Sequence, residues 1–388
     1  MKTITVVGAS LAGLYAAREL RAQGFDGRLV IVGEERHRPY DRPPLSKQFL
    51  TGAVTREQLT LTDDGDETDL EAEWLLGARA SGLDPWERAV RLEDGRSLST
   101  EGLVIATGAA ARRMPGGDMP GVHTLRTVDD AQALRADLRR GRARVVVIGG
   151  GFIGAEVASS CATMGHEVTV IEAAPLPLVP QLGEEMARAC ATLHKDHGVT
   201  LLCGTGVAAL RGGADGRVGG VELQDGRVRP ADVVVAGIGV RPNTGWLEGS
   251  GLALRDGVVC DAGGATGMPG VVAVGDVARC GDHRSEHWTS ATQQPATAVR
   301  NLLAGETVAE HRALPYFWSD QYGVRVQFAG RRGEGDTVRV AEGSSDDRSF
   351  LAVYENEGRT TAVLAFNRPR PFARMRREMS RASQPVAL

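Results

Sequence analysis

Two glycine-rich turns constrain this chain more than any other feature. The first lies in ITVVGASLAGLYAARELR, where Gly8 and Gly13 follow an apolar strand and precede a helix. The second lies in RVVVIGGGFIGAEVASS, with Gly149, Gly151 and Gly154 in the same setting. Such glycines let the backbone turn tightly and approach a pyrophosphate, which the N-terminus of the following helix attracts. Each turn therefore predicts a dinucleotide site in a Rossmann-like unit.

An acidic residue follows the second strand of each unit. Glu34, with Glu35 beside it, follows LVIV, and Glu172 follows VTVI. A carboxylate at this offset accepts hydrogen bonds from ribose hydroxyls. Two fingerprints with strand, helix and acid predict that the chain holds two dinucleotides at once. The simplest reason to hold two is to pass electrons between them.

The residues after Glu172 predict which nicotinamide cofactor binds. Ala173 and Ala174 follow, and neither can pair with a phosphate as an arginine would. A carboxylate at this position accepts the 2′-hydroxyl of NADH and repels the 2′-phosphate of NADPH. The second site is therefore predicted to bind NADH.

Composition is that of a globular enzyme of several domains. The chain has 388 residues, 50 of them glycine, and a formal net charge of −4, so we expect no general attraction to nucleic acid. Because the first strand begins by Ile4, we expect no signal peptide. The apolar run Val145–Ile148 is too short to span a bilayer. Five cysteines show no C-x-x-C and no metal spacing. We expect reduced thiols, no metal, no membrane association and a cytoplasmic location.

The order of the strands predicts an interrupted domain. The strand ending before Gly275 and Asp276 resembles the strands of the first unit more than those of the second. Alternating stretches such as VRVQFAG and TAVLAF near the C-terminus predict an antiparallel sheet. The predicted division is listed along the chain: first part of the first nucleotide domain, 1–111; second nucleotide domain, 112–239; remainder of the first, 240–311; C-terminal domain, 312–388.

Eight segments together resemble one family, the FAD-dependent pyridine-nucleotide reductases of the ferredoxin-reductase type that includes putidaredoxin reductase and dioxygenase reductase components. The resemblance covers nearly the whole chain. It is carried by Arg38–Lys47, Ala106–Ala109, Thr124–Ala131, Gly149–Glu156, Gly237–Asn243, Val274–Ala278, Glu286–Trp288 and Pro315–Gly323. The fold class it implies is α/β: two Rossmann-like domains, the second inserted in the first, and a C-terminal α+β domain with an antiparallel sheet.

The resemblance implies catalytic roles for Lys47 and Glu156. In the family such a lysine and glutamate meet near the flavin. A fixed ammonium would stabilise the negative charge that hydride transfer leaves on the ring, and the carboxylate would hold the lysine in place.

The same resemblance, with the two fingerprints, implies the cofactor-binding residues. The residues expected to bind FAD are Gly8, Ser10, Ala12, Gly13, Glu34, Glu35, Arg42, Lys47, Thr107, Gly108, Arg126, Gly275, Asp276, Trp288 and Trp318. Those expected to bind NADH are Gly149, Gly151, Phe152, Ile153, Gly154, Glu156, Glu172, Gly237 and Gly239. Ser10 replaces the usual middle glycine and fits only if its backbone dihedrals are ordinary. A helix is expected near Trp288, and Pro295 either begins it or kinks it.

The favoured electron acceptor is an acidic iron–sulfur ferredoxin that binds transiently and feeds an oxygenase. FAD takes two electrons as hydride and can release them one at a time. An arginine-rich C-terminal segment with a single acid, Glu378, is a candidate docking surface: Arg368, Arg370, Arg374, Arg376, Arg377 and Arg381.

Two alternatives remain open. One is an NADH oxidoreductase with a small acceptor such as a quinone, a radical or oxygen. The other is a flavoprotein similar to apoptosis-inducing factor, with a mainly binding role. Disulfide reductases of related fold carry a cysteine pair after the first turn, where this chain has RPPLSKQFL. Electrons are therefore expected to leave the flavin without a dithiol. The oligomeric state is left open.

Overall fold

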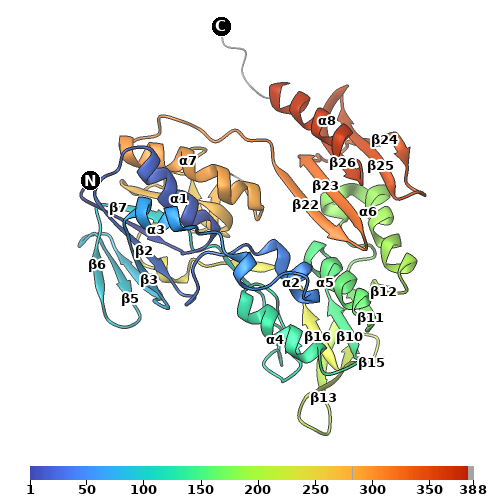
Figure 1. Cartoon of the computed structure of the whole chain (residues 1–388). Coiled ribbons are helices and arrows are strands. Elements are labelled where there is room, and N and C mark those ends of the chain that lie inside the picture. Colours follow the sequence, from blue (N-terminus) through green and yellow to red (C-terminus); the bar gives the residue numbers. More distant parts are fainter. Residues whose placement is uncertain (282, 383–388) are drawn as a thin grey trace. The chain divides into compact units, whose positions relative to one another are not determined.

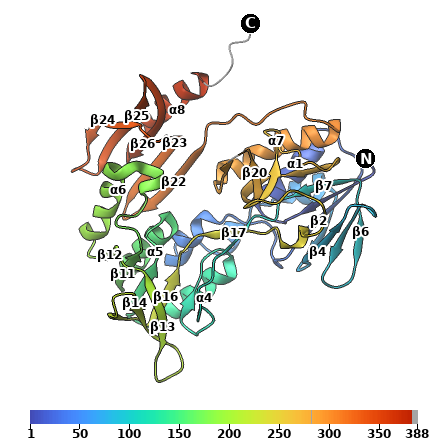
Figure 2. The ribbon, with the colours of Figure 1, turned by 180° about the vertical axis from the view of Figure 1, so that it is seen from behind.

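The computed structural model of the chain describes residues 1–281 and 283–382, which form two compact units (Figures 1 and 2). Each unit is assembled from three separate stretches of chain. Unit 1 comprises Met1–Asp41, Leu59–Ala110 and Arg241–Pro315. Unit 2 comprises Arg42–Gln58, Ala111–Val240 and Tyr316–Leu388.

The centre of unit 1 is a five-stranded parallel sheet. Its strands, in spatial order, are β19 (Val271–Ala273), β7 (Gly102–Ile105), β1 (Thr3–Val7), β2 (Arg28–Gly33) and β3 (Ala72–Leu76). β19, β7, β1 and β2 are rich in Val, Ile and Leu and are buried on both faces, as is usual in a parallel sheet, whereas the edge strand β3 is only partly buried. Because β19 comes from the stretch after residue 240 and pairs with β7, the interrupted sheet expected from the sequence is present.

Helices and small sheets cover the parallel sheet of unit 1. The helices are α1 (Leu11–Ala22), α3 (Asp64–Leu70), α7 (Trp288–Ala304) and the 3-10 turns η3 (Gly245–Leu247) and η4 (Gly275–Val277). α1 and α7 lie side by side and bury apolar residues in one cluster (Figure 1). The small sheets are β4 (Ala80–Asp84), β5 (Ala89–Leu92), β6 (Ser97–Ser99) and β18 (Val258–Cys260), β20 (Ala278–Cys280), β21 (His283–Arg284). Pro295 lies inside α7, so it does not begin that helix.

Unit 2 has a parallel sheet of the same kind. In spatial order its strands are β12 (Thr200–Cys203), β11 (Glu167–Glu172), β10 (Arg144–Ile148), β16 (Val233–Ala236) and β9 (Val122–His123). An antiparallel extension consists of β13 (Val207–Gly212), β14 (Val218–Leu223) and β15 (Val228–Pro230). The helices around the sheet are η1 (Pro43–Ser46), α2 (Gln48–Thr51), α4 (Val128–Leu138), α5 (Phe152–Thr163) and α6 (Val179–Asp196).

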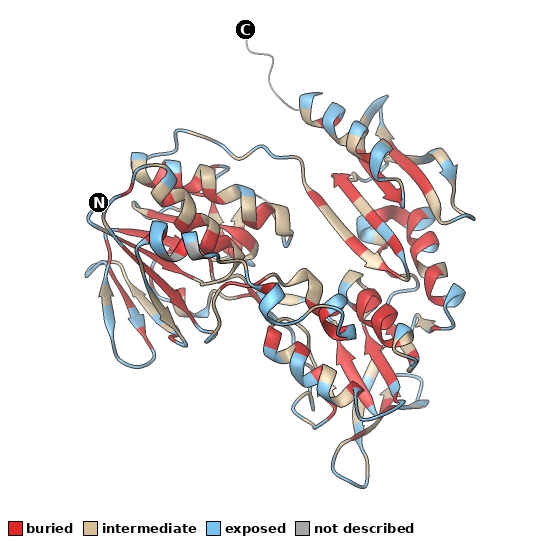
Figure 3. Ribbon diagram, in the orientation of Figure 1, coloured by how far each residue is buried: buried red, intermediate tan, exposed pale blue. Residues whose placement is uncertain are grey.

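The C-terminal part of unit 2 is an antiparallel sheet with a final helix. Its order is β22 (Tyr316–Gln321), β23 (Val324–Gly330), β26 (Arg359–Phe366), β25 (Ser349–Asn356) and β24 (Thr337–Ser344), and α8 (Pro369–Ala382) follows. Helix α6 packs on this sheet, and Leu182, Met186 and Leu193 share its buried core with Phe350 and Phe366. Figure 3 shows buried segments on both the helix and the sheet. α6 therefore joins the second parallel sheet and the C-terminal sheet into one body.

Two further short strands lie where the chain passes from one unit to the other, β8 (Ala109–Ala111) and β17 (Val240–Pro242). The predicted fold class is confirmed. In each parallel sheet one strand, β1 or β10, leads into a glycine-rich turn, and the C-terminal sheet is antiparallel.

Candidate functional site

The first glycine-rich turn has a backbone that only glycine allows. Gly8 has φ of 123°, and a Cβ on it would lie 2.1 Å from the carbonyl oxygen of Ala106. A Cβ on Gly13 would lie 1.8 Å from the carbonyl oxygen of Gly8. Ser10, the N-cap of α1, has φ of −120°, so the serine fits with ordinary dihedrals. The turn is thus shaped for close approach of a ligand to the N-terminus of α1.

The acids after β2 lie beside this turn. Gly33 abuts the turn, since a Cβ on it would lie 2.5 Å from the Cβ of Ala9. Glu34 follows, is exposed, and has its carboxylate 3.6 Å from Arg79. Glu35 accepts a 2.5 Å hydrogen bond from the hydroxyl of Tyr40. Both carboxylates therefore lie at the end of β2 where the sequence placed them.

A reciprocal clasp holds the end of β7. The hydroxyl of Thr107 donates to the carbonyl of Asn243 at 2.9 Å, and the amide of Asn243 donates to the carbonyl of Thr107 at 2.8 Å. The backbone N–H of Asn243 also donates to the carbonyl of Gly108, which has φ of 63°. This clasp fixes the predicted cofactor residues Thr107 and Gly108, and Asn243 is a contributor that the sequence analysis did not single out.

The remaining predicted residues of unit 1 lie around η4 and the start of α7. The N–H of Gly275 donates to the side chain of Gln294 at 2.8 Å. Asp276 follows, and its carbonyl accepts a 3.1 Å hydrogen bond from Arg284. Trp288 begins α7, and its ring N–H donates to the carboxylate of Asp41 at 2.9 Å. A Cβ on Gly275 would lie 2.8 Å from the Cβ of Ala12, so η4 meets the helix of the first turn.

The second turn repeats the backbone of the first. Gly149 has φ of 103°, and a Cβ on it would lie 2.3 Å from the carbonyl oxygen of Gly237. A Cβ on Gly154 would lie 2.0 Å from the carbonyl oxygen of Gly149. At Gly151, the N-cap of α5, a Cβ would meet no atom within 4 Å. The turn is closed on the sheet side and open above Gly151, as a pyrophosphate site requires.

Glu172 lies against this turn. One carboxylate oxygen accepts the backbone N–H of Gly150 at 2.8 Å, and the other accepts that of Ala174 at 2.9 Å. Both oxygens keep further lone pairs for a ribose hydroxyl. The negative charge of Glu172 therefore lies at the end of β11 beside the glycines.

Other predicted residues of this site differ in exposure. Ile153 is half-exposed at 50%, whereas Phe152 packs on Phe317 with ring centroids 4.7 Å apart. Gly237 lies next to the turn, and Gly239 has φ of 89° in the exposed segment after β16.

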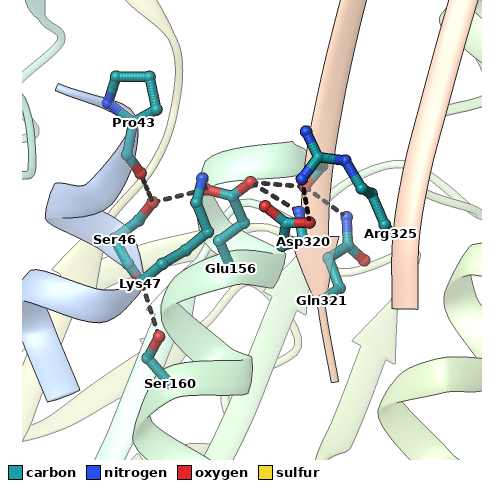
Figure 4. Close-up of polar contacts among 9 residues, drawn as sticks. Pro43, Ser46, Lys47, Glu156, Ser160, Asp320, Gln321 and Arg325 are labelled. Atoms are coloured by element: carbon teal, nitrogen blue, oxygen red, sulfur yellow. Dashed lines mark hydrogen bonds and ion pairs between the residues drawn. The ribbon is translucent and has the colours of Figure 1, made fainter. Parts of the chain in front are cut away.

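A buried carboxylate in unit 2 accepts hydrogen bonds from two segments that lie far apart in the sequence (Figure 4). Glu156, on α5, is 3% exposed. One of its oxygens accepts from Lys47 at 2.9 Å and from the hydroxyl of Ser46 at 2.5 Å. The other accepts from the hydroxyl of Ser319 at 2.7 Å and from the backbone N–H of Asp320 at 3.2 Å. A buried charge is stable only when paired and hydrogen-bonded, and four donors meet that requirement here.

Lys47 and Glu156, the predicted catalytic pair, are thus brought together. The ammonium of Lys47 is 11% exposed and forms the ion pair from the end of η1. The hydroxyl of Ser160, one turn further along α5, donates to the carbonyl of Ser46 at 2.7 Å and holds that segment on the helix. Ser319 in turn accepts a 3.0 Å hydrogen bond from Gln321. We name Ser46, Lys47, Glu156 and Ser319 the Glu156 cluster.

Three further predicted residues lie in unit 2. Arg42 donates to the carbonyl of Arg126 at 2.7 Å, so these two are neighbours. The backbone N–H of Arg126 donates to Asp130 of α4 at 3.0 Å. Trp318 lies on β22, stacks on Tyr316 with centroids 5.9 Å apart, and is only partly buried.

Two of the cysteines lie in contact, although the spacing of cysteines in the sequence did not predict a pair. Cys260 and Cys280 have their Sγ atoms 3.2 Å apart, although twenty residues separate them. Within residues 1–281 and 283–382, no cluster of three or more His, Cys, Asp or Glu could hold a metal ion.

The fold and site define a class: an enzyme with two Rossmann-like units, each with a glycine-rich turn, and a buried lysine–glutamate pair. The family profile of the Pyridine nucleotide-disulphide oxidoreductases matches residues 2–295, and that of the Reductase C-terminal domain matches residues 316–387. The chain belongs to this oxidoreductase family, and it carries the reductase C-terminal domain. The predicted resemblance is confirmed.

Known ferredoxin reductases are similar in sequence to nearly the whole chain. The benzene 1,2-dioxygenase system ferredoxin–NAD(+) reductase subunit of Pseudomonas putida is 37% identical over 95% of this chain and 90% of its own. The corresponding component of the anthranilate 1,2-dioxygenase system of Burkholderia cepacia is 38% identical over 98% of this chain and 94% of its own. The structure of a covalent putidaredoxin reductase–putidaredoxin complex matches with a TM-score of 0.92 and 32% identity, covering 98% of this chain and 93% of that one.

A membrane-spanning helix is not found in the part of the chain that the structure describes, where each helix is too short or too polar to cross a bilayer.

Proposed function

We propose that this oxidoreductase is an FAD-dependent NADH:ferredoxin reductase that supplies electrons to an oxygenase. The observation that carries the proposal is the full-length similarity to ferredoxin reductases of several oxygenase systems, together with two glycine-rich turns. The alignments with these relatives cover 95% and 98% of this chain, so the similarity includes the C-terminal domain and is not limited to a common nucleotide fold.

The first turn fits FAD. The turn at the N-terminus of α1, where the chain's own backbone leaves no room for a Cβ on Gly8 or Gly13, is of the tight kind that accepts a pyrophosphate. Glu34 and Glu35 are proposed to bind the adenosine ribose, and Asp276 the ribityl chain. The other proposed FAD residues are Ser10, Ala12, Arg42, Thr107, Gly108, Arg126, Gly275, Trp288 and Trp318. When bound, FAD supplies the step from a hydride donor to one-electron acceptors.

The second turn is proposed to bind NADH. Gly149 and Gly154 let the turn pack tightly on the sheet, Gly151 leaves room for the pyrophosphate, and Glu172 accepts the ribose 2′-hydroxyl. A 2′-phosphate would meet the carboxylate of Glu172 at the same place, and the repulsion would disfavour NADPH. Phe152, Ile153, Gly237 and Gly239 are proposed to complete the site.

Lys47 is proposed to stabilise the negative charge that hydride transfer leaves on the flavin ring. Its ammonium is held by a carboxylate that three other donors fix in place, so the ammonium does not have to reorganise when the charge appears. Ser46 and Ser319 are positioning residues in this proposal, because they act on Lys47 through Glu156.

The proposed acceptor is an acidic ferredoxin, and α8 is a proposed docking surface. In α8, Arg374 pairs with Glu342 at 2.6 Å and Arg376 lies over the ring of Tyr316, 4.1 Å from its centroid. Arg370, Arg377 and Arg381 are exposed on the same helix. The part of the arginine segment offered to a partner is therefore smaller than its sequence suggests. The division into domains at residues 111, 239 and 311 and a cytoplasmic location remain predictions.

A panel of acceptors tests this function against its alternatives. Purified protein loaded with FAD is supplied with NADH and with a 2Fe–2S ferredoxin, a quinone or oxygen. The ferredoxin should be reduced with the highest specificity constant. A quinone or oxygen that surpasses ferredoxin would support the small-acceptor alternative, and slow oxidation of NADH with every acceptor would support a mainly binding role.

A further inference from the structure

Two cysteines of unit 1 face each other across neighbouring strands. β18 and β20 are parallel, and Cys260 and Cys280 are register partners at their ends. Their Sγ atoms are 3.2 Å apart and share a hydrogen bond. Cys260 is 6% exposed and Cys280 is partly exposed. Cα atoms of directly paired strand residues lie within the range that a disulfide spans.

We propose that Cys260 and Cys280 form a redox-convertible dithiol, a modification site that a hydroperoxide closes to a disulfide. The thiolate of Cys280 attacks one peroxide oxygen, the O–O bond breaks, and hydroxide or alkoxide leaves. The resulting sulfenic acid on Cys280 is attacked by the Cys260 sulfur, so the S–S bond forms and water leaves. In total, two thiols are oxidised, and one hydroperoxide is reduced to water and an alcohol or to two waters.

The surroundings favour Cys280 as the attacking thiol. The hydrogen bond from Cys260 lowers the pKa of Cys280, while burial and the nearby Asp261 carboxylate oppose this shift. The same hydrogen bond, burial and charge raise the pKa of Cys260, which therefore remains a protonated thiol while Cys280 is oxidised and reacts only in the second step. A thiolate is the reactive form, so a lower pKa and partial exposure direct oxidation to Cys280.

The other three cysteines lack this combination. Burial raises the pKa of Cys161 and of Cys190 to about 12, and both are enclosed in the core of unit 2. Burial also raises the pKa of Cys203, and the Glu172 carboxylate raises it further. None of the three has a sulfur partner among the contacts of the described residues. Oxidation should therefore be selective for the pair.

A disulfide at this location would restrain the backbone near Asp276. Cys280 lies four residues after Asp276 on the segment that η4 begins, and Arg284, after the pair, holds the carbonyl of Asp276. An S–S bond would tie the end of β18 to this segment and close a loop over residues 260–280. The dithiol itself does not depend on the proposed function, because no cofactor enters its chemistry.

Mass spectrometry tests the proposal directly. The folded protein is treated with hydrogen peroxide, its free thiols are alkylated after unfolding, and the digest is analysed without reductant. A cross-linked peptide that contains Cys260 and Cys280, with two hydrogens lost and restored by dithiothreitol, is expected. Cys203→Ser should leave the cross-link unchanged, whereas Cys260→Ser should abolish it and leave a sulfenic acid on Cys280 that a dimedone probe captures.

Three results would contradict the proposal. In one, both cysteines remain fully alkylatable after peroxide treatment of the folded protein. In the other, Cys280 is oxidised singly to sulfinic acid in the wild type, with no cross-linked peptide. A cross-link that forms equally in protein unfolded before oxidation would also contradict the role of the strand register.

Discussion

At the scale of single residues, the best-defined group is the carboxylate of Glu156. Its four donors are Ser46 of η1, Lys47 directly after it, and Ser319 and Asp320 of β22, so segments far apart in the chain meet on one side chain. Such a network is costly if one donor is lost, because the buried charge then keeps an unsatisfied lone pair. This makes the Glu156 cluster sensitive to single substitutions.

Lys47→Ala and Ser319→Ala should form a graded series. Lys47→Ala should slow reduction of bound FAD by NADH strongly while FAD binding changes little. Ser319→Ala removes one hydrogen bond to a charge, worth about 1.5–3 kcal/mol, so it should slow the same step less, and Ser319→Thr should restore it. Stopped-flow bleaching of the flavin measures the rate, with the exposed Lys195→Ala as control. An unchanged rate in Lys47→Ala would show that Lys47 is not involved.

Glu172 should determine the choice of nicotinamide cofactor. Loss of a hydrogen bond to a charged group costs about 1.5–3 kcal/mol, roughly tenfold to 150-fold in affinity. The specificity constant for NADH should therefore exceed that for NADPH in the wild type. Glu172→Arg should move the preference toward NADPH. Glu172→Gln keeps an acceptor for the N–H of Gly150, so this variant should reduce the preference for NADH over NADPH without reversing it. Equal specificity constants in the wild type would refute this assignment.

At the scale of elements, α6 is the connection between the second parallel sheet and the C-terminal sheet. Near its end, His194 is 2% exposed, and its Nδ1 shares a 2.8 Å hydrogen bond with the hydroxyl of Tyr322. His197 stacks on the same ring at 4.7 Å. Burial lowers the pKa of His194 to about 4. The folded state therefore favours the neutral imidazole.

This lowered pKa predicts acid sensitivity. The unfolded chain binds a proton at His194 near pH 6.5 and the folded chain only near pH 4, so the contribution is complete above pH 6.5 and is lost as the pH falls toward 4. The loss is about 3 kcal/mol at most. Denaturant unfolding at pH 7 and pH 4.5 should show a smaller decrease for His194→Gln than for the wild type. Equal decreases would mean that His194 is charged in the folded state.

The helix α8 should contribute to ferredoxin docking through its exposed arginines. Arg370, Arg377 and Arg381 are changed together to Glu, which spares the contacts of Arg374 and Arg376. Because salt screens exposed charges over about 10 Å at 0.1 M, wild-type ferredoxin reduction should slow as ionic strength rises. The variant should need more ferredoxin and show a flatter salt dependence, with unchanged reduction of a neutral dye. Normal ferredoxin reduction by the variant would place docking elsewhere.

At the scale of the whole molecule, the sequence predicted those features that depend on residues close together in the chain, such as turns and alternating strands. The turns at Gly8 and Gly149 follow from glycine spacing within a few residues, and the antiparallel C-terminal sheet follows from alternation. The family resemblance supplied the pairing of Lys47 with Glu156. Ser319 was not predicted, because its contact with Glu156 spans 163 residues and leaves no periodic signal.

Residues that meet only because two strands pair in a particular register could not be predicted from the sequence either. Cys260 and Cys280 meet only because β18 and β20 pair in parallel with those residues opposite. No C-x-x-C or other spacing marks such a pair. The arginine-rich segment shows the converse case: its composition was visible, but the use of Arg374 and Arg376 in contacts within unit 2 was not.

The central claim is that the protein transfers electrons from NADH through bound FAD to a ferredoxin. The most direct test is an anaerobic assay in which purified protein, NADH and a 2Fe–2S ferredoxin are mixed and the visible absorbance of the ferredoxin is followed. We expect about one FAD per chain and rapid ferredoxin reduction that requires both NADH and the FAD-loaded protein. A protein that binds no FAD even after reconstitution, or that is reduced by NADH yet leaves ferredoxin oxidised, would contradict the account.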